Sequence, residues 1–175
     1  MKKKFFLILY YSIFRWLPVS YRLGGGIAKR LRYLACSHIF KKCGANVNIE
    51  RGAFFGNGSK VVVGDNSGIG INAVIPNDII IGDNVLMGPE VYILSQNHNF
   101  DRIDIPIGKQ GNKLPVHPCI IENDVWIGRQ VTIMPGRVIK TGSVIAACTC
   151  LCKDFPAYSV VGGNPSRLIK SRLNN

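Results

Sequence analysis

Aliphatic side chains recur at every sixth position along two stretches of the chain. The positions are Val63, Ile69, Ile75, Ile81, Met87 and Ile93 in the first stretch, and Ile121, Ile127, Ile133, Ile139, Ile145, Leu151 and Ala157 in the second. Twelve of the thirteen are Val, Ile, Leu or Met, whereas chance would place about four such residues there. The period therefore marks a repeated structural unit.

The residues around each aliphatic position indicate how this unit turns. Glycine often follows the aliphatic residue directly. The residue four places after it is often small or β-branched, as at Ser67, Ala73, Val85, Val91, Val125, Val131, Ser143 and Thr149. We expect a prism whose short flat sides each point one aliphatic side chain inward, while Gly, Asn and Asp form the corners. The sequence thus predicts an all-β parallel coil over residues 45–163.

A stack of coils leaves two open ends that need covers. Residues 1–44 are predicted to form helices over one end. Residues 164–175 are predicted to form a helix over the other end, with Asn164 as its N-cap and Pro165 at its first position. The inward-facing residues of that helix would be Leu168, Ile169 and Leu173.

A long insertion separates the two runs. Ile93 and Ile121 are 28 residues apart, which is not a multiple of six, so the second run restarts in a new phase. The insertion, residues 97–119, has charges of both signs, prolines and little apolar periodicity, and such loops are usually functional. His98 lies where the coils meet this loop, which suits either a reactive histidine on a rigid base or one that only hydrogen-bonds at a loop root.

The N-terminal third carries nearly all of the net charge of +12. Residues 1–60 hold 12 Lys and Arg against the single acid Glu50, which leaves +11 there and +1 in the remainder. A segregated positive charge favours a polyanionic surface, either nucleic acid or an anionic membrane leaflet. The apolar stretch from Phe5 to Phe14 favours the membrane, although it is too short to span a bilayer as a helix, and we expect no nucleic acid partner.

A second N-terminal segment reads as a basic amphipathic helix. Ile27, Leu31 and Leu34 share one helical face, while Lys29, Arg30 and Arg32 project mostly elsewhere. Such helices suit membrane surfaces, and no small-residue cleavage site follows the first apolar stretch. The two open alternatives are a peripheral membrane contact and helices that merely cap the fold.

Composition places the chain among folded single domains, because 47% of its 175 residues are apolar and 18% are charged. The six cysteines form no C-x-x-C pair, so zinc-ribbon spacing is missing and we expect no metal. Free thiols fit a reducing compartment, which predicts a cytoplasmic protein, peripheral on the inner membrane surface if its N-terminus binds lipid. Cys148, Cys150 and Cys152 alternate, and we expect them to be small buried filler.

Residues 121–172 resemble the C-terminal coils of the sugar O-acetyltransferases that include maltose and galactoside acetyltransferases. The segments "NDVWIG" and "KDFPAYSVVGGNPSR" carry the resemblance, together with the histidine on the loop. It extends more loosely back to Val47, and the N-terminal helices resemble those of bacterial exopolysaccharide acetyltransferases. The resemblance implies a left-handed parallel β-helix of hexapeptide repeats, with N-terminal helices and a short C-terminal helix.

The resemblance also implies a chemistry. The family's general base matches the histidine of "NHNFD", which gives that role to His98, and the acceptor hydroxyl would attack acetyl-CoA directly. Asp101 would orient the imidazole or bind acceptor hydroxyls, or else only solvate the loop. No G-x-S-x-G elbow occurs, so covalent catalysis by the protein is not expected.

Family positions suggest where the coenzyme lies. Trp126 would line the coenzyme tunnel or the acceptor site, and the backbone N–H of Arg129 would polarise the thioester carbonyl. Ala146 and Ala147 would leave room for the pantetheine arm. The basic residues near the nucleotide phosphates would be Arg167, Lys170 and Lys153. Cys148 and Cys152 replace a Gly and a Thr that many relatives have, so the local coenzyme contacts differ.

The sequence and the resemblance also suggest acceptor ligands, an assembly and alternative functions. Asn72 and Asn97 are the candidate acceptor ligands for a sugar or glycan. Family members are trimers with sites between neighbouring β-helices, so His98 of one subunit would face Trp126 of the next. Serine or xenobiotic acetylation, or a non-catalytic structural role, remain alternatives. A carbonic-anhydrase-like zinc site needs three imidazoles, and the three histidines of this chain are unsuitably spaced.

Overall fold

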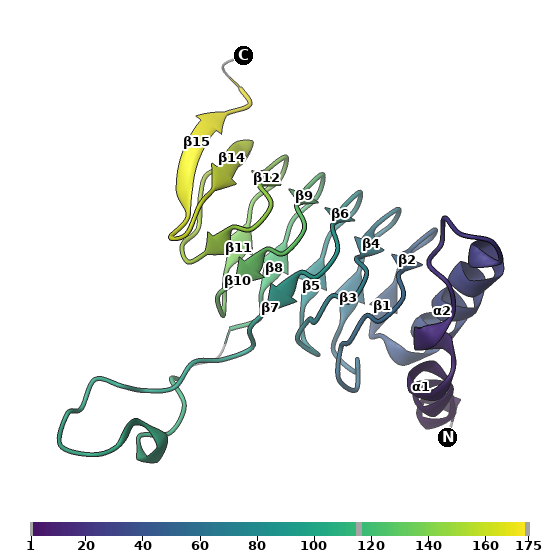
Figure 1. Cartoon of the computed structure of the whole chain (residues 1–175), viewed down its shortest axis with the longest axis horizontal. Coiled ribbons are helices and arrows are strands. Elements are labelled where there is room, and N and C mark those ends of the chain that lie inside the picture. Colours follow the sequence, from purple (N-terminus) through teal and green to yellow (C-terminus); the bar gives the residue numbers. More distant parts are fainter. Residues whose placement is uncertain (1, 115–116, 174–175) are drawn as a thin grey trace.

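The chain forms an elongated parallel β-solenoid in this computed structural model, which describes residues 2–114 and 117–173. Two helices lie at one end, and a two-stranded extension lies at the other (Figure 1). The helical elements are α1 (Lys2–Ser12), η1 (Phe14–Trp16), α2 (Gly25–Ile39) and η2 (Ile107–Lys109). The strands are β1 (Lys42–Cys43), β2 (Asn48–Ile49), β3 (Val62–Val63), β4 (Gly68–Ile69), β5 (Ile80–Ile81), β6 (Leu86–Met87), β7 (Tyr92–Ile93), β8 (Ile120–Ile121), β9 (Trp126–Ile127), β10 (Thr132–Ile133), β11 (Val138–Ile139), β12 (Val144–Ile145), β13 (Cys150–Leu151), β14 (Ser159–Gly162) and β15 (Arg167–Ser171).

Short parallel strands stack into three flat faces. The first face has the order β1-β3-β5-β8-β11, and the third has β7-β10-β13. The second begins with β2-β4 and continues along β6-β9-β12-β14. Equivalent positions pair without slippage, as where Ile81 lies between Val63 and Ile121. The predicted parallel coil is therefore confirmed.

Most flat sides of the prism point two side chains into the interior. The aliphatic residue of each six-residue unit is buried, and in most units so is the residue two places before it, as for Val125 and Ile127. Arg137, two places before Ile139, is half-buried instead. Ala157 departs from this rule, because the longer connection after β13 ends the six-residue spacing and the last coil points Val161 inward instead. Each coil thus buries apolar surface mainly against its neighbours.

Close stacking explains the glycine and asparagine positions. A Cβ atom on Gly70 would lie 1.9 Å from the carbonyl oxygen of Gly88 in the next coil, so a side chain has no room there. Asn66 and Asn84 turn equivalent corners of neighbouring coils in the left-handed region, with φ of 55° and 57°. Asparagine tolerates this conformation better than most residues, which fits the predicted corner chemistry.

The N-terminal helices cap the first coil, and α2 turns an arginine towards it. Ile27 and Leu34 are exposed, whereas Arg32 is fully buried. Arg32 forms an ion pair with Glu50 and donates hydrogen bonds to backbone carbonyls of the linker and of β2. Ile27 and Leu34 of the predicted apolar face therefore lie outward, because the end of the coil offers polar groups that a buried guanidinium satisfies. No helix within the described ranges combines the length and apolarity needed to cross a bilayer.

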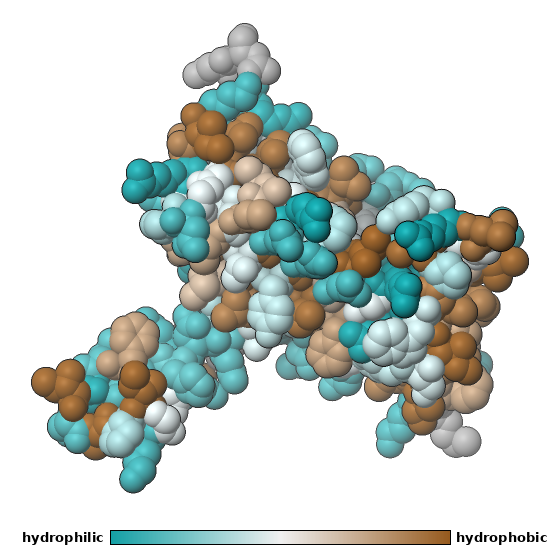
Figure 2. All heavy atoms as spheres, viewed as in Figure 1, coloured by the Kyte–Doolittle hydropathy of each residue, from teal (hydrophilic) through white to brown (hydrophobic). Residues whose placement is uncertain are grey.

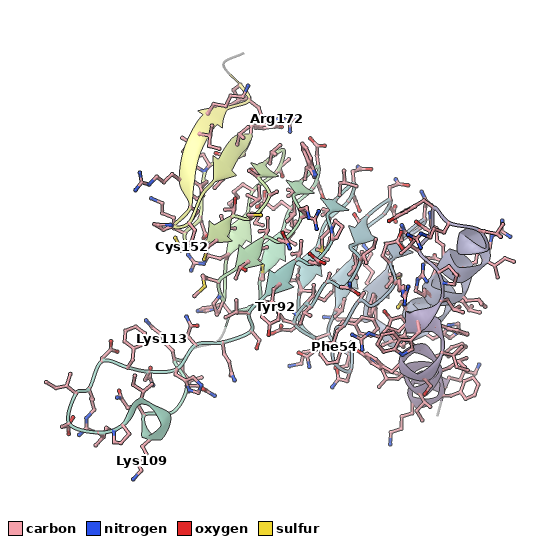
Figure 3. All side chains as sticks on the ribbon, viewed as in Figure 1. Phe54, Tyr92, Lys109, Lys113, Cys152 and Arg172 are labelled. Carbon is pink, nitrogen blue, oxygen red and sulfur yellow. The ribbon has the colours of Figure 1, made fainter. Side chains whose placement is uncertain are left out.

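The predicted insertion is an arm that projects from the prism between β7 and β8 (Figure 1). Its two sides are joined by backbone hydrogen bonds, from Asn99 N to the Gly111 oxygen at 2.9 Å and from Lys113 N to the Asn97 oxygen at 2.8 Å. Figure 3 shows Lys109 far from the prism and Lys113 nearer to it. The arm root is therefore ordered by the chain's own backbone.

The C-terminal segment is a strand, so the predicted helix was wrong. β15 runs antiparallel to β14, and Leu168, Ile169 and Leu173 are exposed rather than packed inward. The local capping signals of Asn164 and Pro165 are overridden because the final strand of the second face offers an open edge of backbone donors and acceptors. Pairing with β15 covers this edge.

Candidate active site

His98 stands at the root of the arm. Its backbone forms an antiparallel bridge with Asn112, and its side chain is exposed. Among the described residues none hydrogen-bonds to the imidazole, and Asp101, which is also exposed, makes no contact with it that would orient the ring. The backbone thus fixes the position of His98, while both ring nitrogens remain open to a ligand.

A cavity of about 300 Å³ lies beside the arm root. Asn97 lines it together with Lys113, His117 and Arg137. The sequence-based prediction named Asn97 but missed the other three residues. Arg137 in particular lies far from Asn97 in the sequence, so only the fold brings the two together. The only sequence signal was a second histidine near the end of the insertion.

Trp126 lies on the second face of the prism, in β9. Its register partners are Leu86 in β6 and Val144 in β12. The indole is 54% exposed, so this tryptophan is not a core residue. A large exposed aromatic ring on a rigid sheet provides a surface on which a ligand can pack.

Unpaired amides mark the corner that follows Trp126. No described residue accepts a hydrogen bond from the N–H of Arg129, or from the N–H of Ala147 in the next coil. The two coils touch here, because a Cβ atom on Gly128 would lie 2.5 Å from the Ala147 nitrogen. The Arg129 side chain is drawn aside to Glu90, 3.5 Å away. Its amide is therefore free to donate to an oxygen of a ligand.

The predicted basic residues near the coenzyme phosphates lie on and before β15. Arg167 pairs with Gly162, and Lys170 pairs with Val160, because a bulge interrupts the register between them. Paired residues point to the same side of a sheet, so Arg167 and Lys170 share one side as expected, although no helix places them there. Lys153 is exposed, and its ammonium lies 5.5 Å from the centre of the Phe155 ring.

The cysteine cluster is not buried filler, which corrects the expectation. Cys148 and Cys152 are exposed and Cys150 is half-buried. Hydrogen bonding from the Ser166 side chain lowers the pKa of Cys152 below the usual thiol value. Of the three, only Cys150 lies in β13, and Cys152 follows the strand. Cys148 forms the corner before it, with φ of 61°.

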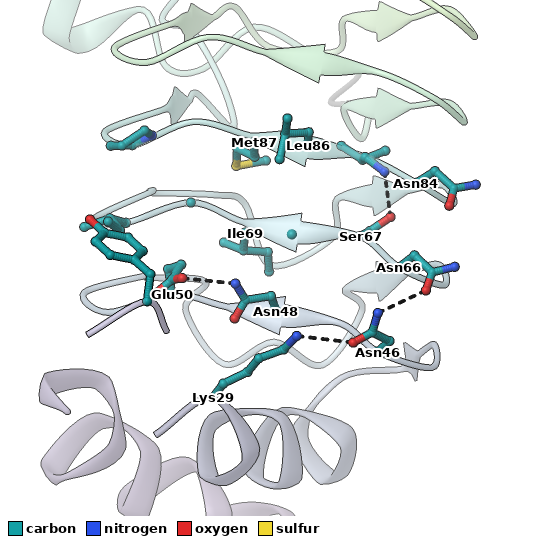
Figure 4. Close-up of a pocket in the computed structure, with 16 residues that line it drawn as sticks. Lys29, Asn46, Asn48, Glu50, Asn66, Ser67, Ile69, Asn84, Leu86 and Met87 are labelled. Carbon is teal, nitrogen blue, oxygen red and sulfur yellow. Dashed lines mark hydrogen bonds between the residues drawn. The ribbon is translucent and has the colours of Figure 1, made fainter. Parts of the chain in front are cut away.

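A polar groove of about 470 Å³ lies on the second face along β2, β4 and β6, beside the helical cap (Figure 4). Asn48 donates to Glu50 at 3.0 Å, while its own side-chain oxygen is buried without a partner among the described residues. Burial opposes ionisation of Glu50, but hydrogen bonds from Ser20 and Asn48 and the charge of Arg32 hold its pKa below the usual value. The exposed side-chain amides of Asn46, Asn66 and Asn84 line the same groove and match the hydroxyls of a sugar.

The single chain does not assemble all predicted residues. Asn72 is an exposed corner residue that lines a cavity beside the helical cap, whereas Asn97 lines the cavity at the arm root. His98 and Trp126 arise from different faces of the prism. The described chain therefore holds two partial sites, a base on the arm and a ligand surface on the second face.

The fold has a family. Residues 32–154 match the family described as the GLGC left-handed parallel beta-helix domain. The chain belongs to this family of left-handed parallel β-helix proteins, and the predicted handedness is confirmed.

Within that fold, this chain is similar to several acetyltransferases. The chain is 35% identical over 134 residues to galactoside O-acetyltransferase of Escherichia coli strain K12, which covers 75% of this chain and 64% of that protein. The chain thus spans less than two thirds of this relative. A hexapeptide-repeat containing acetyltransferase from Vibrio cholerae superposes with a TM-score of 0.77 at 27% identity, over 97% of this chain and 90% of that one.

Two solved structures of such proteins contain the coenzyme. The Vibrio cholerae protein has also been solved with acetyl coenzyme A. A galactoside acetyltransferase in complex with coenzyme A superposes with a TM-score of 0.76 at 28% identity, over 97% of this chain and 80% of that one. The resemblance expected from the sequence is confirmed.

Proposed function

We propose that the protein is an acetyl-CoA-dependent O-acetyltransferase that acts on a hydroxyl of a sugar or polysaccharide precursor. The observation that carries the proposal is the pair of unpaired amides at Arg129 and Ala147 beside the exposed Trp126. The solved relatives that hold the coenzyme support the choice of donor. The amide-rich groove beside Trp126 supports a carbohydrate acceptor.

Each group has a defined role in a direct transfer. His98 removes the proton from the acceptor hydroxyl as its oxygen attacks the thioester carbonyl. The N–H of Arg129 stabilises the resulting oxyanion. Collapse of this intermediate forms the ester and expels the coenzyme A thiolate, which the imidazolium of His98 protonates. Asp101 orients the imidazole once the acceptor is bound.

The remaining site residues bind the two substrates. Trp126 packs along the coenzyme. The small side chains of Ala146 and Ala147 leave room on the surface of the coil for the pantetheine arm. The nucleotide phosphates bind to Arg167, Lys170 and Lys153. Asn72 and Asn97 contact the acceptor from neighbouring subunits.

A homotrimer would unite the partial sites. Large apolar residues are exposed on the flat faces of the prism, among them Leu86 at 63%, Trp126 at 54% and Tyr92 at 50%. Exposed apolar surface on rigid strands is typical of subunit contacts. In the proposed trimer the arm of one subunit brings His98 to Trp126 of the next.

The location follows from the thiols and the N-terminus. All six cysteines are free, which fits the reducing cytoplasm, where acetyl-CoA is available. We also propose that the basic N-terminal helices contact an anionic membrane surface.

Release of free coenzyme A thiol from acetyl-CoA, measured over a panel of sugar acceptors, tests the activity. Acceptor-dependent release is expected, and release that no acceptor accelerates would contradict the proposal.

A further inference from the structure

A second cavity lies between the helical cap and the first corners of the prism, with a volume of about 780 Å³. We call it the linker groove, because much of its wall is the segment that links α1 to α2. The lining residues used here are Trp16, Tyr21, Arg22, Leu23, Arg51 and Asn72. The groove thus combines aromatic and aliphatic surface with two guanidinium groups.

The positive charge of the linker groove is unopposed. Arg22 and Arg51 are exposed, and neither guanidinium has a hydrogen bond or ion pair with any described residue. No carboxylate lines the groove. Glu50 is the only acid in residues 1–60, and it is buried and already paired with Arg32. Two free guanidiniums at one cavity are a fit for phosphate oxygens, which arginine binds in a bidentate manner.

The walls of the groove are fixed before any ligand arrives. Arg15 donates from Nε and Nη2 to the Gly52 oxygen at 3.1 and 3.0 Å, and the Gly52 N–H donates back at 2.9 Å. Ser20 donates from its backbone to Glu50 at 3.1 Å, and Val19 is buried. The linker is therefore tied to the first coils on both sides of the groove.

Exposed apolar surface adjoins the groove and continues over the outer faces of both helices (Figure 2). Leu23 is 99% exposed, Ile8 and Ile27 are each 67% exposed, and Phe5 is 62% exposed. The charged residues among positions 2–49 are all basic. An apolar plane with only positive charges around it complements the anionic leaflet of a membrane.

We infer that the linker groove binds the phosphate group of an anionic membrane lipid, with Arg22 and Arg51 as its ligands. The outer faces of α1 and α2 then lie in the bilayer interface. This inference rests on the proposed membrane contact and extends it to a site. The linker groove shares Tyr21 and Ile71 with the polar groove, so a glycan joined to such a lipid through its phosphate enters the proposed acceptor site directly.

Vesicle binding tests the site without an assay of activity. The full chain is titrated with vesicles of phosphatidylcholine containing phosphatidylglycerol, and with vesicles of phosphatidylcholine alone. Arg30→Ala removes one exposed charge from the same surface, so it is expected to weaken binding about fivefold. Arg22→Ala and Arg51→Ala remove a charged hydrogen-bonding partner as well, and each is expected to weaken binding more than about tenfold. Arg51→Lys keeps the charge but is expected to bind more weakly than the native chain.

Each outcome decides between the claims. If the arginine variants bind as tightly as Arg30→Ala while the double variant Phe5→Ser/Ile8→Ser releases the vesicles, the membrane contact stands and the phosphate site is overturned. If the native chain binds no anionic vesicle, both are overturned. Saturable binding of inorganic diphosphate without vesicle binding would assign the groove to a soluble phosphate and would also overturn the inference. Unchanged acetyl-CoA binding in every variant confirms that the donor site is unaffected.

Discussion

The guanidinium of Arg32 and the carboxylate of Glu50 form a buried ion pair, with Nη2 of Arg32 3.5 Å from Oε2 of Glu50. Arg32 also donates to the backbone oxygens of Leu17 and Pro18, at 3.3 and 3.0 Å. Ser20 holds the carboxylate from the other side. These contacts join α2, the linker and the first coil, and they explain why α2 presents its large apolar residues to the outside.

Replacing Arg32 by alanine should destabilise the fold strongly. The change leaves Glu50 buried without its cation, and loss of one partner of a buried pair costs about 3–5 kcal/mol. Arg30→Ala, on the exposed side of the same helix, is the matched control and should change stability by less than about 0.5 kcal/mol. Urea unfolding measures both. Equal losses in the two variants would contradict the role given to the pair.

Acid should weaken the same network. The pKa of Glu50 is lower in the folded chain than its usual value, so its contribution to stability is complete above the usual carboxyl pKa. That contribution disappears as the pH falls through the lower, folded pKa. Urea midpoints measured from neutral to acid pH should therefore fall less steeply for Glu50→Gln than for the native chain. Parallel pH profiles would show that Glu50 does not titrate as described.

A methyl group at Gly70 should disrupt the stacking of the coils. A Cβ atom there would overlap the Gly88 carbonyl oxygen, and overpacking of this kind costs about 1–3 kcal/mol. Gly26 offers a contrast, because it lies exposed in α2 with no atom within 4 Å of a new Cβ. Gly26→Ala should stabilise the chain by about 0.5–1 kcal/mol. Thermal melting compares the two variants. A Gly70→Ala protein that melts at the same temperature as the native chain would refute the stacking argument.

The repeat could be predicted from the sequence because each inward residue contacts mainly its equivalents in adjacent coils. The pairing of Ile81 with Val63, 18 residues earlier, is an example of a contact that the six-residue spacing alone defines. Arg32 could not be predicted, because its partner Glu50 becomes available only when the cap meets the first coil. The helix expected after Asn164 failed for a similar reason, since an open strand edge outweighs a local capping signal.

The site was predictable in its parts and not in its assembly. His98 could be singled out because it interrupts the repeat, and Trp126 because it is a large residue among small ones. The unpaired amides of Arg129 and Ala147 could not be predicted from residue type, because every amino acid except proline supplies the same backbone N–H. The linker groove could not be predicted either, because Arg22 and Arg51 line the same cavity although they are far apart in sequence.

Loss of the His98 imidazole should remove the general base and leave the fold intact. The side chain is exposed and unbonded, so His98→Ala should melt like the native chain while kcat falls by about 10²- to 10⁴-fold. His38 is the control, because it stacks on Phe6 in the helical cap, with ring centres 4.2 Å apart. Steady-state turnover with an active acceptor compares the variants. Normal turnover by His98→Ala would show that another group takes the proton.

Calorimetric titration of the purified protein with acetyl-CoA tests the central claim most directly, because it probes the donor site without knowledge of the acceptor. We expect saturable binding that is weakened by Arg167→Ala and unchanged by Lys60→Ala, which removes an exposed charge from the turn before β3. Absence of saturable binding by the native protein would contradict the assignment of an acetyl-CoA-dependent transferase and would leave His98 without its proposed reaction.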